Sequence, residues 1–264
     1  MKLAKWRELC DRGPELVLCL DFPGGRAAAG FAELAAGTPV ELCFLHIGQP
    51  DPAAPAQRLD AHVEEWVGEA LGTGRPVRAV LGYCAGAALA TRVADAIHAV
   101  APVAPPAVIL FDAAAVTGTT LCDQFASSLE SSSAHLAAGE LDDARQWSAE
   151  LLDAHPDDLP RVAAGLADRY DRLMAGVADR LSLDEFFRRE LTSGFAAYLA
   201  YLLLAGQGGL DLRAGMPLFL SSQDHEPPVA PACGLSFDVG REQLLRDTEV
   251  STFVAGLLRG DHPW

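Results

Sequence analysis

From residue 15 to about residue 112, apolar and polar positions alternate between two patterns. Short, almost continuously apolar runs indicate strands that are buried on both faces. They cover Glu15–Asp21, Val40–His46, Val77–Leu81 and Ala107–Phe111. The segments between these runs have helical periodicity or are rich in alanine: 28–36, 56–71 and 87–100. Buried strands that alternate with helices predict a mostly parallel sheet with helices on both faces.

The pattern changes after this region, where helical periodicity continues without a strand signal. The predicted helices are Leu121–Ala138, Leu141–Ala154, Leu159–Arg180 and Leu183–Gly206. Strand-like runs return at Met216–Ser221 and Val250–Leu257. Four helices are too many for a simple crossover between neighbouring strands. We therefore expect residues 1–116 and 208–264 to form the α/β core, and residues 117–207 to form an inserted helical lid.

A short motif follows the third predicted strand. The sequence Gly82-Tyr83-Cys84-Ala85-Gly86 lies between that strand and an alanine-rich helix. Strand, tight turn and helix are the context of a nucleophile elbow, in which flanking glycines allow a strained turn that exposes the central side chain. Serine is usual at the centre of this motif, and here the residue is Cys84. A thiol is more acidic than an alcohol and its thiolate is a strong nucleophile, so Cys84 is the candidate nucleophile.

Composition excludes several other classes of protein. The net charge of −16 disfavours nucleic acid and anionic membranes as partners. The N-terminus lacks a signal peptide, and the apolar runs are shorter than the roughly 18 residues of a membrane span, so we expect a cytoplasmic protein. The six cysteines form no CxxC pair, and the glycines lack a dinucleotide fingerprint, so we expect neither a metal nor a cofactor.

A nucleophilic cysteine requires a base, and the base requires an acid that orients it. Among the seven histidines, His262 follows the last predicted strand in a Gly-Asp-His turn, and we choose it as the base. Asp112 directly follows the strand Ala107–Phe111, and Asp224 follows the next strand. Both are strand-end positions suited to the orienting acid. Asp112 is preferred and Asp224 is the alternative.

The developing negative charge of the reaction requires hydrogen-bond donors. In a nucleophile elbow one donor is the amide after the nucleophile, here Ala85, and a second comes from the loop after the first strand. Gly24, in Phe22-Pro23-Gly24-Gly25, is the natural second donor.

Taken together, these segments resemble the thioesterase domains of nonribosomal peptide and polyketide synthases, a branch of the α/β-hydrolases. The matching pieces are Phe22-Pro23-Gly24-Gly25, Leu81-Gly82-Tyr83-Cys84-Ala85-Gly86, Leu110-Phe111-Asp112, the helical insertion and Gly260-Asp261-His262. Synthase-embedded members carry their acid at the position of Asp112, whereas free-standing members favour the position of Asp224. This chain departs from the family in its cysteine nucleophile and in ending soon after His262.

The resemblance implies release of an acyl or peptidyl chain from the phosphopantetheine thioester of a carrier protein. The acyl group would pass through an acyl-cysteine on Cys84 and leave by cyclisation, aminolysis or hydrolysis.

Two alternatives remain open at this stage. Gly82-Tyr83-Cys84 with Gln223-Asp224-His225 is similar to dienelactone hydrolases, which use a Cys-Asp-His triad but lack a long helical insertion. The other alternative is a non-catalytic binding protein with a hydrolase-like fold, because the nucleophile is unusual. The reactivity of Cys84 relative to the other cysteines distinguishes an enzyme from a binding protein.

Overall fold

A computed structural model describes residues 3–22, 30–48, 58–101, 105–210 and 216–261, apart from the side chains at positions 188 and 191. The chain divides into two compact units. Among the described residues, Val116–Leu204 forms one of them, and the segments before and after it form the other.

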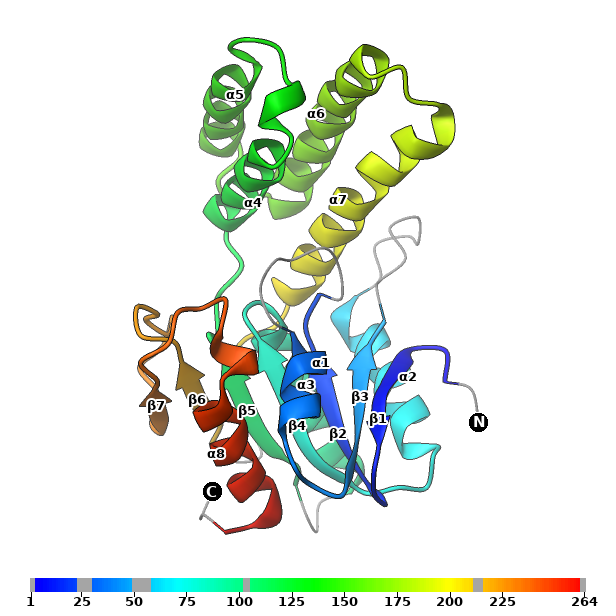
Figure 1. Ribbon diagram of the computed structural model, residues 1–264, viewed down its shortest axis with the longest axis vertical. Coiled ribbons are helices and arrows are strands. Elements are labelled where there is room, and N and C mark those ends of the chain that lie inside the picture. Colours follow the sequence, from blue (N-terminus) through cyan, green and yellow to red (C-terminus); the bar gives the residue numbers. More distant parts are fainter. Residues whose placement is uncertain (1–2, 23–29, 49–57, 102–104, 211–215, 262–264) are drawn as a thin grey trace. The chain divides into compact units, whose positions relative to one another are not determined.

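Seven strands form one sheet within the described part of the first unit, in the order β1-β3-β2-β4-β5-β6-β7 (Figure 1). Strand β1 pairs antiparallel with β3, and the remaining neighbours pair in parallel. The strands are β1 (Trp6–Asp11), β2 (Glu15–Leu20), β3 (Leu42–Ile47), β4 (Val77–Tyr83), β5 (Ala107–Phe111), β6 (Leu218–Ser221) and β7 (Gly234–Ser236). This arrangement confirms the predicted mostly parallel sheet.

Helices cover both faces of the sheet. They are α1 (Phe31–Gly37), α2 (Leu59–Leu71), α3 (Gly86–Val100) and α8 (Thr248–Arg259), with a short 3-10 helix, η2 (Leu244–Arg246). α1 and α8 lie on one face, and α2 and α3 lie on the other (Figure 1). The first face contains a core in which Phe31 of α1 and Val254 of α8 pack with inward-facing strand residues such as Phe111. The burial of both sheet faces explains why the strands are almost continuously apolar.

The strand predicted at Val250–Leu257 is wrong, because these residues lie in α8. Asp247 caps this helix: its carboxylate accepts hydrogen bonds from the N–H groups of Glu249 and Val250 at 2.8 and 3.1 Å. Gly260 ends it with a positive φ of 83°. The cap and the C-terminal glycine fix a helix over a segment whose β-branched residues favour a strand.

Two strands are absent from the sequence prediction. β1 is an edge strand in which all residues but Trp6 are exposed or half-buried, and β7 has only three residues, all exposed. Neither segment has the apolar run that identified the central strands. The omission of β7 matters because the segment after it reaches the carboxyl ends of the parallel strands.

The second unit contains helices α4 (Gly118–Glu130), α5 (Glu140–Ala154), α6 (Leu159–Arg180) and α7 (Glu185–Ala205), with a 3-10 turn, η1 (Ser133–His135). Four aromatic rings lie together at its centre. Phe125 has its ring centroid 6.3 Å from Trp147, 6.5 Å from Tyr170 and 6.1 Å from Phe195. Phe125 itself is fully buried. The helical periodicity of this region therefore reflects a hydrophobic core of its own.

The apolar residues of α7 form a band that divides between two environments. Phe195, Leu199 and Leu202 are buried in the helical unit, whereas Phe186 and Phe187 are exposed. The buried members of the band are thus explained by packing.

None of the described helices is long and apolar enough to cross a membrane.

Candidate active site

The turn between β4 and α3 has the geometry of a nucleophile elbow. Cys84 has a φ of 54°, a left-handed conformation that costs a non-glycine residue about 1–3 kcal/mol. Gly82 is required because a Cβ there would lie 2.7 Å from Cα of Ala87 and 2.8 Å from Cβ of Ala90. The close approach of helix and strand places Cys84 at the carboxyl end of β4, with the N-terminus of α3 directly after it.

Backbone hydrogen bonds hold Cys84 in this strained conformation. Its N–H donates to the carbonyl of Phe111 at 2.9 Å. Its carbonyl accepts from the N–H groups of Ala87, at 3.1 Å, and Ala114, at 3.2 Å. The elbow is thus tied both to α3 and to the end of β5, so the position of its side chain is well defined.

Asp112 lies at the corresponding end of β5. It also has a positive φ, 40°, and its N–H donates to the carbonyl of Leu220 in β6 at 3.0 Å. The residue is fully buried. Ser222 satisfies its carboxylate: the backbone N–H lies 2.8 Å from Oδ1, and the hydroxyl lies 3.1 and 3.0 Å from Oδ1 and Oδ2. A buried carboxylate needs such donors to remain charged.

Arg241 connects the thiol to this carboxylate. Its Nη2 lies 2.9 Å from Sγ of Cys84, and its Nε lies 4.0 Å from Oδ2 of Asp112. The guanidinium carbon lies 6.0 Å from the ring centroid of Tyr83, and the side chain is 50% exposed. Arg241 therefore occupies the bridging position between nucleophile and acid that histidine holds in a hydrolytic triad.

The charges of this cluster influence one another. Burial by itself lowers the pKa of Arg241, but Cys84, Tyr83 and Asp112 more than offset that effect and hold the pKa above its ordinary value. Burial raises the pKa of the Tyr83 hydroxyl, and the nearby Arg241 acts in the opposite direction. The guanidinium is thus a permanent cation beside a neutral phenol, and it cannot accept a proton.

The two predicted acids have different surroundings. Asp112 is buried, lies beside Arg241 and belongs to the cluster around Cys84. Asp224 is exposed, and its carboxylate has no hydrogen bond or ion pair with any described residue. The geometry favours Asp112 over Asp224 as the acid of this site.

Of the two predicted oxyanion donors, Ala85 lies within the described residues. It is buried and directly precedes α3. An α-helix leaves its first N–H groups without intrahelical acceptors, so the amide of Ala85 is suited to bind a developing negative charge. Gly24 lies outside the described residues.

His262, the predicted base, also lies outside the described residues. The chain that leads to it is described as far as Asp261. In α8 the carbonyl of Leu258 accepts a hydrogen bond from Nε of Arg78 at 3.0 Å, and Arg78 lies near the start of β4. From Arg78 to Cys84 the chain advances by about 20 Å at about 3.3 Å per residue. The described chain thus ends at the opposite end of the parallel strands from Cys84 (Figure 1), and His262 as the base stays a prediction.

His225 lies at the carboxyl end of the parallel strands and differs from the histidine chosen as the base. Its Nε2 lies 2.9 Å from the carbonyl oxygen of Ala113, next to Asp112, and the ring is partly buried. A carbonyl oxygen only accepts, so Nε2 carries the proton in this arrangement. His225 is therefore held by the backbone carbonyl of Ala113.

Two residues of this site escaped the sequence analysis: Arg241 and Ser222. Ser222 stands next to a predicted strand end and could have been chosen as a partner of an acid. Arg241 carried no comparable signal, because the short, exposed strand β7 that leads to its loop was not recognised.

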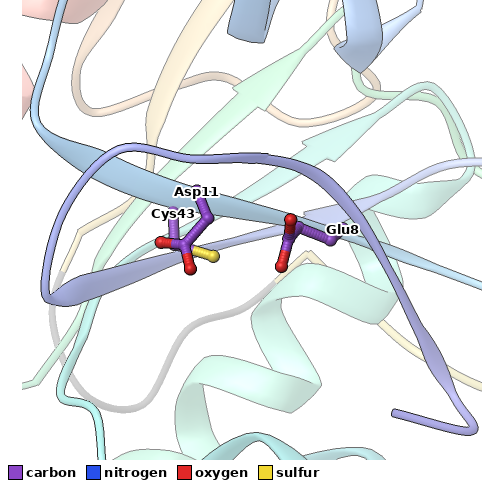
Figure 2. A group of neighbouring side chains, drawn as sticks. All are labelled: Glu8, Asp11 and Cys43. Atoms are coloured by element: carbon purple, nitrogen blue, oxygen red, sulfur yellow. The ribbon is translucent and has the colours of Figure 1, made fainter. Parts of the chain in front are cut away.

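A separate cluster lies at the amino end of β3. Figure 2 shows Glu8, Asp11 and Cys43, whose ligand atoms lie within 4.8 Å of one another. Asp11 already pairs with the guanidinium of Arg75 at 2.8 Å. Burial raises the pKa of the Cys43 thiol to about 11. A protonated thiol and an occupied carboxylate are poor metal ligands, so we assign no metal to this cluster.

The sheet order and the elbow together define an α/β-hydrolase fold, and comparison with solved structures agrees. The Vlm2 thioesterase domain bound with a dodecadepsipeptide is 17% identical, with a TM-score of 0.52 over 98% of both chains. The NocB thioesterase domain, in covalent complex with a fluorophosphonate nocardicin G analog, is 14% identical, with a TM-score of 0.52 over 96% of both chains.

A four-domain nonribosomal peptide synthetase bound to AMP and glycine gives a TM-score of 0.59 at 16% identity. The match covers 98% of this chain and 20% of that protein. No protein-family model matches the sequence, and a comparison with curated proteins gives no match either. At these identities the similarity establishes the fold.

Proposed function

We propose that this protein is a thioesterase or acyltransferase that takes an acyl or peptidyl chain from the phosphopantetheine thioester of a carrier protein. The observation that carries the proposal is the elbow, in which Cys84 is held at a φ of 54° before the N-terminus of α3. Strain at a non-glycine residue persists where the surrounding structure enforces it, and it is common at catalytic nucleophiles. Thioesterase domains among the structural neighbours make a carrier-bound thioester the most consistent substrate.

In the proposed reaction the Cys84 thiolate attacks the carbonyl carbon of the thioester. The amide of Ala85 stabilises the oxyanion of the tetrahedral intermediate. When this intermediate collapses, the carbon–sulfur bond to phosphopantetheine breaks and its thiolate leaves, so Cys84 carries the acyl group. An amine, hydroxyl or water then attacks the carbonyl carbon of the acyl-cysteine and loses one proton to solvent, and the carbon–sulfur bond to Cys84 breaks with release of the Cys84 thiolate.

Transfer of the acyl group from one thioester to another changes its free energy of hydrolysis little. The acyl-cysteine therefore stays activated, and the second step can form an amide or a strained ring. This chemistry favours aminolysis or cyclisation over hydrolysis. No resident cofactor takes part in the proposed steps.

Labelling of Cys84 tests the proposal. Incubation with an acyl-N-acetylcysteamine thioester, followed by intact-protein and peptide mass spectrometry, should show one acyl group on Cys84. Cys84→Ala should abolish the adduct. Cys233→Ala removes an exposed cysteine and should leave it unchanged. Full turnover by Cys84→Ala would contradict the mechanism, and absence of any adduct in the unmodified protein would favour a non-catalytic role.

The dienelactone-hydrolase alternative requires Asp224 as the acid. The exposure of Asp224 and the burial of Asp112 beside Arg241 argue against it.

A further inference from the structure

We propose that Arg241, in place of a histidine, holds Cys84 as a reactive thiolate, so that the resting site is a Cys84–Arg241–Asp112 charge cluster. This inference rests on the proposed function for its catalytic meaning. Its central claim concerns the charge state of Cys84, which can be measured without a substrate.

The distance between the guanidinium and the sulfur supports a thiolate. Nη2 of Arg241 lies 2.9 Å from Sγ of Cys84, a contact that a guanidinium makes favourably with a negatively charged sulfur. The N-terminus of α3 directly follows Cys84 and adds a second positive influence. Both features stabilise the thiolate relative to the thiol.

Asp112 and Tyr83 hold Arg241 in this position. Its Nε faces Oδ2 of Asp112 at 4.0 Å, and its guanidinium lies against the ring of Tyr83. The Asp112 carboxylate is itself fixed by Ser222. The acid thus orients a cation toward the nucleophile, in the way that a triad acid orients an imidazolium.

The permanent charge of Arg241 also determines where the Cys84 proton goes. A guanidinium cannot act as a base, so in this cluster the Cys84 proton goes to solvent before the substrate binds. The thiolate then attacks without a general base. When the acyl group leaves Cys84, the thiolate is regenerated beside the same cation. A site of this kind favours acceptors that attack without deprotonation, such as a neutral amine, over water.

The test is the pH dependence of Cys84 alkylation by iodoacetamide, followed at the peptide level. In this reaction the thiolate sulfur forms a bond to the methylene carbon, the carbon–iodine bond breaks and iodide leaves. Cys84 should react at lower pH than exposed Cys233 in the same sample. Arg241→Met should slow Cys84 at pH 7 by about tenfold or more and move its profile to higher pH.

Matched variants separate charge from structure. Arg241→Lys keeps the cation and should retain most of the reactivity. Arg246→Met removes an exposed arginine nearby and should change nothing. Because Arg241 is half-exposed, about 1 M salt should move the unmodified profile toward that of Arg241→Met.

Among the described residues, the other titratable groups at this end of the strands include Tyr83 and Asp112, which face Arg241, and His225, which contacts the carbonyl of Ala113. His225→Gln and His262→Gln should leave the alkylation profile in place. If Arg241→Met alkylates like the unmodified protein, or if a histidine variant produces the shift instead, the inference is wrong.

The experiments distinguish failure of the proposed function from failure of the role proposed for Arg241. If Cys84 accepts an acyl group but Arg241→Met has an unchanged alkylation profile, the proposed function stands and the role of Arg241 is wrong. If Arg241→Met moves the profile but Cys84 is never acylated by thioesters, the charge cluster stands and the proposed function is wrong. Circular dichroism of each variant verifies that the fold is retained.

Discussion

At the scale of single residues, the site depends on two strained positions. Cys84 and Asp112 both have positive φ and both end a parallel strand. Each is held by a backbone hydrogen bond to the next strand, from Cys84 to Phe111 and from Asp112 to Leu220. The strain is therefore supported by the sheet, and it directs both side chains to the same edge.

The role of Asp112 can be tested against the alternative acid. Asp112→Asn removes the negative charge that faces Arg241 but keeps an oxygen that can accept from Ser222. We expect acyl-Cys84 formation to slow by about tenfold or more. The loss should be milder than the about 10⁴-fold effect known for a serine triad, because a thiol loses its proton more readily. Single-turnover kinetics with the acyl-thioester measure the rate.

Asp224→Asn is the matched control, since that carboxylate is exposed and lies outside the charge cluster. Its rate should stay close to that of the unmodified protein. The reverse order of the two effects, with both proteins folded, would transfer the acid role to Asp224.

At the scale of elements, the strand–turn–helix of β4 and α3 is the most constrained part of the first unit. Gly82 leaves no room for a side chain, since the carbonyl oxygen of Gly86 would lie 2.8 Å from an added Cβ. Glycine at position 82 is thus required for packing as well as for the exposure of Cys84.

We expect Gly82→Ala to lower the free energy of unfolding by about 1–3 kcal/mol, the usual cost of overpacking. It should also displace Cys84 and reduce its acylation. Urea denaturation measures the first effect and thioester labelling the second.

Gly68→Ala provides the comparison, because nothing lies within 4 Å of a Cβ added at Gly68 in α2. Alanine favours a helix over glycine by about 0.5–1 kcal/mol, so this variant should be neutral or stabilised. Equal stability of the Gly82 and Gly68 variants would refute the packing argument.

At the scale of the whole molecule, the chain forms two hydrophobic cores. Phe125 lies at the centre of the helical unit and Phe44 in β3 of the sheet unit, and both are fully buried. Truncation of a buried phenylalanine costs about 3–5 kcal/mol. The effect of each truncation should be strongest in its own unit.

Hydrogen exchange with mass spectrometry can compare the two substitutions. Phe125→Ala should increase exchange in Val116–Leu204 and preserve protection in the strands. Phe44→Ala should increase exchange in the sheet unit. A uniform loss of protection in both variants would mean that the cores unfold as one cooperative unit.

The sequence by itself determined the features that depend on neighbours along the chain. Continuous apolar runs identified the central strands, and helical periodicity located α6 at its observed bounds, Leu159–Arg180. Glycines around Cys84 identified the elbow, because only such residues permit that turn. Asp112 followed from its position at a strand end. These signals are local, so they can be recognised without knowledge of the fold.

The tertiary structure decided which distant residues meet. Val250–Leu257 forms a helix, because the cap at Asp247 and the packing of α8 against the sheet outweigh the strand preference of the β-branched residues. The tertiary structure also places Arg241 beside Cys84. The described chain ends at the opposite end of the parallel strands from Cys84. Contacts between residues far apart in sequence depend on strand order and register, which hydrophobic periodicity does not encode.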